Sequence, residues 1–335
     1  MEYAGAEGTR RMHAPAAAPV DAQQSASRRA LFCYRSTRPM LALPDPTLGA
    51  LASLASALIW AVVGLCVRRL SGTLNSPTIN ALRTMGAGVL LMAWVLATAG
   101  VEGLREIGLP TFALLAASIV ISGSLGDTIF FESARFLGLA RAMTASMTYP
   151  MVSAALAAMF LREPITPALI MGSVLTLGGL ALIVGERPNE PDRPGHLWLG
   201  LLTSQAASLA WAVGVIMLKV PLTTLDATTA QAVRLPIAAL VLFATPWVWG
   251  SMGAVRQGGA PLAGLLALLA VLTAGSSLLF VVGVKHAGVG VSTVLSSTAP
   301  MFAIPLGTLF LGERITRSAA LGALITVAGV AVLNL

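Results

Sequence analysis

Charged residues are scarce in this sequence, and this scarcity sets the class of the protein. Only 10% of the 335 residues are charged, whereas 56% are hydrophobic. Soluble domains carry roughly 25% charged residues. One water-soluble core cannot enclose so much apolar surface, so the composition predicts a polytopic membrane protein.

Cysteine and lysine are also rare. Cys33 and Cys66 lie in very different sequence settings, so neither a structural disulfide nor a metal site is indicated. The net charge is +7, but the basic residues are scattered at segment ends without interleaved aromatics, which does not indicate a nucleic-acid partner. Lys219 and Lys285 are the only lysines. This arginine bias, with the richness in alanine, suggests a GC-rich bacterial genome and hence the inner membrane.

About ten apolar segments follow a polar N-terminal stretch. Residues 1–46 are aperiodic and predict a disordered tail, with Met40 as an alternative start inside it. The predicted spans cover 47–67, 77–99, 111–133, 138–161, 167–185, 197–218, 228–250, 262–284, 288–311 and 317–335. Residues 186–196 form the one clearly polar linker.

The two sets of five segments are copies of each other. Residues 140–166 match 290–316 at an offset of 150, with the identities Ser146/Ser296, Pro150/Pro300 and Glu163/Glu313. The earlier helices match at an offset of 151, which pairs Trp60 with Trp211 and Arg83 with Arg234. Because five is odd, the second unit must enter the membrane from the opposite side. We therefore predict an all-α fold of ten transmembrane helices in two inverted repeats, 47–185 and 197–335, as in many secondary transporters.

The fourth helix of each repeat has a central proline and ends in F-L-x-E-x-I-T, and a Gly-rich fifth helix follows it. In these features the chain resembles the drug/metabolite transporter superfamily, and within it the EamA-like permeases, over residues 48–335. The resemblance implies a carrier of small metabolites in a lipid bilayer, with exporters of amino acids and related compounds as the leading class. Sugar-phosphate and nucleotide-sugar exchangers are a more distant alternative. The resemblance also implies that both termini are inside, whereas the loop-end cations place more positive charge outside.

The repeated prolines predict polar atoms at membrane depth. Pro150 and Pro300 have no N–H, so the carbonyls of Ser146 and Ser296 lose their helical partners. A bare carbonyl is costly in lipid, so these faces should point to protein, water or substrate. The two broken turns could line a central cavity, or the prolines could serve only to kink the helices for packing.

Three charged residues fall at least six positions from the ends of predicted spans, where charge is costly and faces the protein interior. Arg83 and Asp127 lie at similar depths in the second and third helices, so they could form an ion pair. Arg234 lacks such a partner, because Ser277 stands where the first repeat has Asp127. The arginines could bond helix-end carbonyls as a fold feature. Alternatively, Arg234 could hold a substrate carboxylate, or Asp127 could carry a coupling proton.

Aromatic and acidic residues complete the candidate set. Trp60, Trp211 and Tyr149 could line the cavity or pack between helices. Glu163 and Glu313 at the ends of the repeated stretch should fix the reversal between the fourth and fifth helices, with a gate or a proton site as the alternative. Thr166 followed by Pro167 predicts a helix N-cap.

Two other functional classes are an enzyme within the membrane and a non-transporting scaffold or sensor. Gly126-Asp127 is similar to part of an intramembrane aspartyl protease motif, but that chemistry needs two carboxylates, and no acidic residue lies in the spans before Asp127. A non-transporting scaffold or sensor does not need an inverted repeat with broken helices. No HExxH motif or Gly-rich phosphate loop occurs, so no enzyme activity and no cofactor are expected. The sequence therefore favours a secondary transporter.

Overall fold

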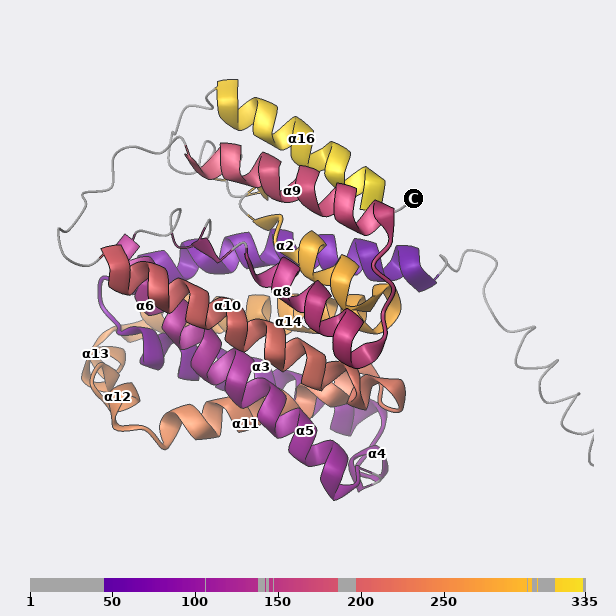
Figure 1. Cartoon of the computed structure of the whole chain (residues 1–335). Helices are drawn as coiled ribbons and strands as arrows, with labels where there is room; N and C mark the ends of the chain where they lie inside the picture. Colours follow the sequence, from indigo (N-terminus) through magenta and orange to yellow (C-terminus); the bar gives the residue numbers. More distant parts are fainter. Residues whose placement is uncertain are drawn as a thin grey trace, which may run out of the picture. The chain divides into compact units, whose positions relative to one another are not determined.

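The computed structural model describes residues 45–105, 107–137, 142, 145, 146, 148–185, 197–299, 301, 302, 306 and 317–333. Within these ranges every regular element is a helix (Figure 1). The first helix begins at Asp45, so the last two residues of the expected tail belong to it. The rest of the tail and the expected linker 186–196 lie outside the described residues.

The helices of the first repeat follow the expected spans. They are α2 (Asp45–Leu70), α3 (Ser76–Thr98), the short α4 (Glu102–Arg105), α5 (Leu109–Ile119), the π-helical segment η1 (Val120–Gly126), α6 (Asp127–Leu137), α8 (Thr148–Leu156), the π-helical segment η2 (Ala157–Leu161) and α9 (Pro167–Gly185). Asn75 begins α3, because its side-chain oxygen accepts the Thr78 N–H at 2.9 Å. The expected third span is thus α5, η1 and α6 in succession, with a π segment in its middle.

The second repeat departs from expectation in two places. Its helices are α10 (Leu197–Lys219), η3 (Pro221–Thr223), α11 (Ala227–Phe243), α12 (Pro246–Trp249), α13 (Met252–Gln257), α14 (Gly259–Ser296) and α16 (Arg317–Leu333). The expected span 228–250 ends early, at Phe243, and the chain bends by 78° into α12 and α13. Pro246 explains the bend, since proline has no N–H with which to continue the helix.

The second departure is that α14 contains the expected eighth span and the start of the ninth. The two parts meet at Gly288, whose φ of 83° and ψ of 170° are not helical. Glycine adopts this conformation without the steric cost that a side chain would add. The break between the two expected spans is therefore a single residue.

Five of the described helical stretches are long and apolar enough to cross a membrane. They are Asp45–Leu70, Ser76–Thr98, Leu109–Leu137, Trp198–Thr223 and Gly259–Ser296, and the bent pair from Ala227 to Gln257 would make a sixth. Thr148–Leu161 and Pro167–Gly179 are shorter apolar helices. Large apolar side chains such as Leu109 and Trp198 are 79% and 75% exposed, as suits a surface in contact with lipid. The all-α membrane fold expected from the sequence is confirmed.

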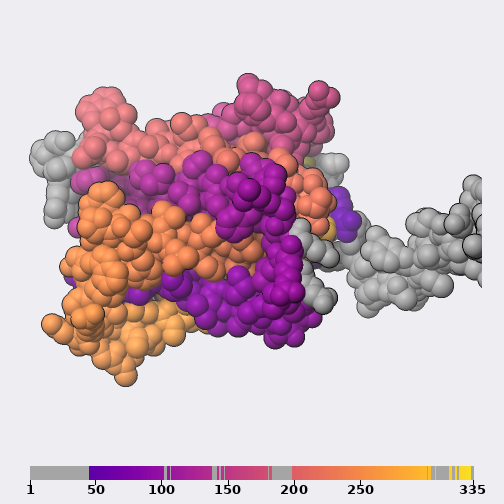
Figure 2. Space-filling model, turned by 90° about the horizontal axis from the view of Figure 1, so that it is seen from below, coloured from indigo at the N-terminus to yellow at the C-terminus, as the bar shows by residue number. Residues whose placement is uncertain are grey.

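The two repeats pack into each other rather than side by side as separate bodies. The main helix pairs are α2 with α14, α3 with α11, α6 with α10, and α9 with α16 (Figure 1). Each pair takes one helix from each repeat. Figure 2 shows the same interleaving on one face, where purple segments of the first repeat alternate with orange segments of the second.

Residues that match in sequence also meet in space where α9 crosses α16. A Cβ on Gly179 would collide with Thr326, and a Cβ on Gly329 would collide with Thr176. Gly179 and Gly329 are equivalent in the repeat, and so are the two threonines. This reciprocal contact explains why both positions keep the same residue in the two copies.

Candidate functional site

A cavity of about 220 Å³ lies between helices of both repeats. This volume is below the roughly 300–1,000 Å³ of drug-sized ligand pockets, so it suits a small solute. Described residues that line it are Ser56, Trp60, Arg83, Thr84, Ile119, Ser122, Gly123, Asp127, Phe130, Ser146, Tyr149, Trp211, Val215, Leu218, Gln231, Arg234, Leu235, Thr273, Ser276, Ser277, Phe280, Ser296, Ser297 and Ala299. They come from α2, α3, α8, α10, α11, α14 and the helix that runs through η1.

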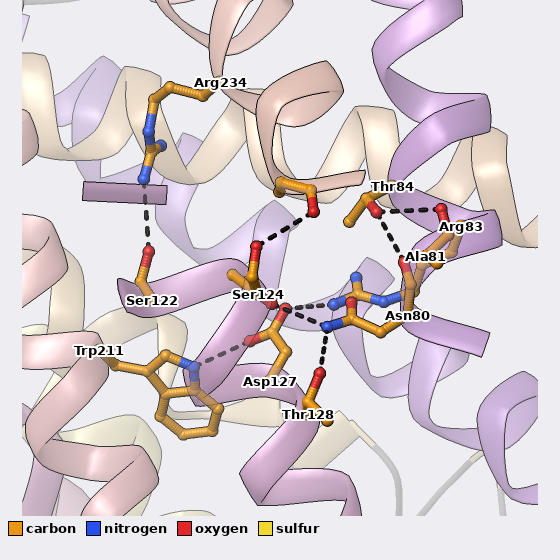
Figure 3. Close-up of polar contacts among 12 residues, drawn as sticks. Asn80, Ala81, Arg83, Thr84, Ser122, Ser124, Asp127, Thr128, Trp211 and Arg234 are labelled. Atoms are coloured by element: carbon orange, nitrogen blue, oxygen red, sulfur yellow. Dashed lines mark hydrogen bonds and ion pairs between the residues drawn. The ribbon is translucent and has the colours of Figure 1, made fainter. Parts of the chain in front are cut away.

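Asp127 joins the two repeats at this cavity. Its Oδ2 forms an ion pair with Nη2 of Arg83 from α3, and its Oδ1 accepts the indole N–H of Trp211 from α10 at 2.8 Å. Figure 3 shows the carboxylate between these two partners. Arg83 is 2% exposed and Asp127 16%. The ion pair that the sequence suggested is present, and the indole donor is a partner that the sequence did not indicate.

The π-helical segment η1 sets the position of Asp127, which is the next residue along the chain. Its wider turn leaves the Gly123 carbonyl to accept the Asn80 side-chain N–H at 2.8 Å, and Asn80 also donates to the Thr128 hydroxyl at 2.9 Å. Gly126 lies against the indole, since a Cβ there would come within 2.8 Å of the Trp211 ring. Single-turn π segments inside α-helices occur frequently at functional sites.

Arg234 is equally buried but has different surroundings. It is 4% exposed. Its Nε donates to the Ser118 hydroxyl at 3.0 Å, Nη1 to Gln231 Oε1 at 2.6 Å, and Nη2 to the Ser122 hydroxyl at 3.5 Å. All three acceptors are neutral, and no ion pair to Arg234 occurs among the described residues. The cavity therefore has one arginine with a carboxylate partner and one without.

Aromatic rings form one wall of the cavity. Trp211 packs edge-on against Tyr149, with ring centroids 5.7 Å apart, and against Phe130 at 5.1 Å. Trp60, its equivalent in the first repeat, lies instead with its ring centroid 5.3 Å from the guanidinium carbon of Arg83. All three aromatic candidates from the sequence line the cavity. The two equivalent tryptophans contact opposite members of the same ion pair.

The broken turn at Pro150 is satisfied both locally and by the other repeat. The Ser146 carbonyl, which proline leaves without its usual helical donor, accepts the Tyr149 N–H at 3.0 Å and the Ser208 hydroxyl from α10 at 3.2 Å. Nearby, Ser204 donates to Ala142 at 2.9 Å and Gln205 to Ala145 at 2.6 Å. The exposed backbone therefore faces protein, as the cost of bare carbonyls in lipid requires. Ser146 and Ser296 line the cavity, while Pro150 is buried behind it.

Glu163 makes contacts with the other repeat that the sequence did not indicate. Its carboxylate accepts the N–H of Val289 at 2.9 and 3.1 Å and of Gly290 at 3.3 Å, and Lys219 Nζ lies 3.9 Å away. These contacts tie the end of the fourth helix to the helical turn that begins after Gly288, so Glu163 connects the two repeats. The reversal itself is capped by Thr166, whose hydroxyl accepts the Leu169 N–H at 3.1 Å. The expected N-cap is confirmed.

Eight of the candidate residues line one cavity: Trp60, Arg83, Asp127, Ser146, Tyr149, Trp211, Arg234 and Ser296. Pro300 and Glu313 lie outside the described residues. The sequence interpretation missed Gln231 and most of the hydroxyls. Gln231 could have been found from the repeat, because it matches Asn80 at an offset of 151 and both precede an arginine by three positions.

Comparison of the sequence with known proteins identifies a family that matches both repeats. The family described as the EamA-like transporter family matches residues 47–185 and again residues 198–335. A protein of Archaeoglobus fulgidus described as an uncharacterized transporter is 26% identical over 266 residues, which is 79% of this chain and 90% of that protein. An uncharacterized protein of Pseudomonas aeruginosa is 30% identical over 150 residues, 45% of this chain and 50% of that protein.

The fold is also found among solved structures. One crystal structure superposes with a TM-score of 0.69 at 20% sequence identity, and the match covers 85% of this chain and 95% of the other. At this identity the similarity speaks for the fold alone. The double family match falls on the two segments that the internal repeat delimits.

Proposed function

The chain belongs to the EamA-like transporter family, and from this premise we propose that it is a secondary carrier of small metabolites that works by alternating access. Amino acids and related compounds are the first class to test. The cavity carries the proposal, because both repeats line it and because it holds buried charged groups at membrane depth. Charge in such a place marks a substrate or ion path more often than a packing device.

The repeat architecture supports alternating access. In carriers of this kind one repeat moves against the other around a fixed central site. The contact of Glu163 with Val289 and Gly290 crosses between the repeats at the point where α14 breaks. Such a junction would have to open and close during rocking. We also propose a bacterial inner membrane as its location, because of the arginine and alanine bias of the sequence.

Proton coupling is a separate part of the proposal. Asp127 is the one acidic side chain among the described residues that line the cavity. Its contacts with Arg83 and the Trp211 indole both stabilise the negative charge. Loss of coupling in Asp127→Asn, with normal membrane insertion, would assign the proton to this carboxylate, and unchanged coupling would remove it from the pathway.

Flux of labelled solutes in proteoliposomes tests the function. The purified chain is reconstituted, and uptake and efflux of a panel of amino acids and related metabolites are measured with and without a proton gradient. We expect flux of at least one solute, and loss of that flux in Ser146→Leu, which fills the cavity. Val174→Leu is the matched control, because Val174 is 66% exposed on the outer surface.

Two other outcomes of the flux measurement would count against parts of the proposal. If no member of the panel moves while the reconstituted protein remains folded, transport of amino acids and related metabolites is contradicted, and either a solute outside the panel or a non-transporting membrane scaffold becomes the better interpretation. If Ser146→Leu transports as well as the parent chain, transport takes place but the cavity is not its path.

A further inference from the structure

The charges of the cavity do not balance. Among the described residues that line it, the charged side chains are Arg83, Asp127 and Arg234. Two positive charges face one negative charge, so the walls carry one positive charge in excess. A buried charge without a counter-charge is unfavourable, and a ligand of opposite charge would relieve it.

Asp127 contacts one of the two arginines directly. One of its oxygens pairs with Arg83 in the first repeat, and the other accepts the indole N–H of Trp211 in the second repeat at 2.8 Å. Both oxygens are thus occupied, and Asp127 acts on Arg234 only through space. Arg234 has only neutral oxygens as its described partners, from Ser118, Ser122 and Gln231. Arg234 is therefore the arginine of the cavity that has no directly contacting carboxylate among the described residues.

The repeat indicates what is missing beside Arg234. Arg83 and Arg234 are equivalent positions, and the position equivalent to Asp127 is Ser277. Ser277 also lines the cavity, and its hydroxyl donates to the Ala274 carbonyl at 3.2 Å. The second repeat thus keeps the arginine and lacks the carboxylate that would pair with it.

We propose that the transported solute is a small monocarboxylate with an apolar body, and that its carboxylate takes beside Arg234 the place that Asp127 takes beside Arg83. This inference rests on the carrier function proposed above and narrows its substrate class. Guanidinium and carboxylate groups match in planar geometry and form strong charge-assisted hydrogen bonds. The aromatic rings of Tyr149 and Trp211 would receive the apolar body.

The same charge count disfavours other solutes. An α-ammonium group would find no free carboxylate among the described lining residues, so a zwitterionic amino acid should bind less well than the corresponding acid without its amino group. A dianionic phosphate would bring more negative charge than the single available arginine can neutralise. The preferred solute has a net charge of minus one.

Calorimetric titration of the full chain in lipid nanodiscs tests the proposal with four probes that share a phenyl ring. They are 3-phenylpropanoate, L-phenylalanine, 3-phenylpropanamide and phenethylamine. We expect 3-phenylpropanoate to bind at least about tenfold more tightly than the other three, a difference of about 1.4 kcal/mol. Equal or tighter binding of L-phenylalanine, or no binding of any of the four, overturns the proposal.

Substitutions at Arg234 and Ser277 test where the carboxylate of the solute binds. Arg234→Gln should remove the preference for the carboxylate over the amide, and a preference that persists in this variant overturns the assignment to Arg234. Ser277→Asp should supply the missing carboxylate internally and weaken 3-phenylpropanoate at least about tenfold. Ser277→Asn adds the same bulk without charge, and an equal loss in both variants would also contradict the charge argument.

The test separates this inference from the function on which it rests. Selective binding of 3-phenylpropanoate without flux in proteoliposomes would leave the subsite standing and contradict the carrier. Flux of several solutes irrespective of their charge would support the carrier and overturn the monocarboxylate preference.

Discussion

Arg83 and Arg234 stand at equivalent positions of the two repeats, and both are buried at the same cavity. Arg83 is enclosed by an ion pair with Asp127 and by the rings of Trp60 and Phe131, each with its centroid 5.3 Å from the guanidinium carbon. Arg234 is surrounded by hydroxyl and amide oxygens. Both repeats keep the arginine. Its partner is a carboxylate in the first repeat and a set of neutral oxygens in the second.

This difference shows how a duplicated fold can acquire an asymmetric site. The first repeat uses its arginine internally, to hold α3, α6 and α10 together through Asp127 and Trp211. The second repeat keeps its arginine in place with neutral groups, so its charge remains available. An ion pair within the protein stabilises the packing of its helices, whereas a charged side chain without a contacting counter-charge can bind a ligand of opposite charge.

The largest effect should come from removing the counter-charge of Arg83. Asp127→Asn leaves Arg83 buried without a carboxylate, and breaking a buried ion pair costs about 3–5 kcal/mol of stability. Arg234→Gln removes charge-assisted hydrogen bonds to neutral groups but leaves no buried charge stranded, so we expect a smaller loss, of about 1–2 kcal/mol. Unfolding of the purified variants in detergent measures both.

Similar losses in Asp127→Asn and Arg234→Gln would contradict the distinction between the two sites. A double variant provides the control, because Arg83→Gln combined with Asp127→Asn removes the stranded charge. We expect it to recover part of the stability that Asp127→Asn alone loses.

A smaller effect should separate the two equivalent tryptophans. Trp211→Phe removes the N–H that Asp127 accepts, and a hydrogen bond to a charged group contributes about 1.5–3 kcal/mol. Trp60→Phe keeps an aromatic face near Arg83, so we expect it to cost less than about 1 kcal/mol. Combining each change with Asp127→Asn in a double-mutant cycle should show coupling between Trp211 and Asp127. Additive effects there would contradict the hydrogen bond as a stabilising contact.

A similarly small effect should come from the N-caps of α3 and α11, which are also equivalent in the repeat. Asn75 accepts the Thr78 N–H, and Asp226 accepts the N–H groups of Thr228 and Thr229, each at 2.9 Å. Replacing either by alanine should cost about 1 kcal/mol. The two caps differ in charge, so their dependence on pH should differ.

Burial acts to raise the pKa of Asp226, but the hydrogen bonds from Thr229 and Thr228 outweigh it, so the pKa lies below its ordinary value. Such a group stabilises the fold above its unfolded-state pKa, and this contribution is lost as the pH falls through its folded-state pKa. We therefore expect the cost of Asp226→Ala to shrink at acidic pH and that of Asn75→Ala to stay constant. Parallel pH profiles of unfolding for the two variants would contradict the ionic cap.

Much of the fold could be predicted because the apolar spans and the identities between the two repeats follow directly from the order of the residues. The scarcity of charge required a membrane protein, and the matches at offsets of 150 and 151 required two similar units. The places where prediction failed have local physical causes. Pro246 ended a span early, and Gly288 confined the break between two spans to one residue.

The candidate site was predicted as a set of residue types and not as a set of contacts. Charge and proline inside apolar segments are unfavourable without a partner, so Arg83, Asp127, Arg234 and Ser146 could be singled out from the sequence. Several of their partners lie in the other repeat, such as Trp211 for Asp127 and Ser208 for Ser146. Nothing in the local sequence specifies those pairs.

The sequence by itself therefore determined the membrane class, the duplication and the side chains that had to be buried with a partner. Only the tertiary structure decided which partner each one received. In the tertiary structure the two oxygens of Asp127 contact Arg83 and Trp211, and the Glu163 carboxylate accepts the backbone N–H of Val289. The physical reason is that burial depends on the composition of each helix, whereas pairing depends on how far each helix is rotated and on which helix of the other repeat lies against it.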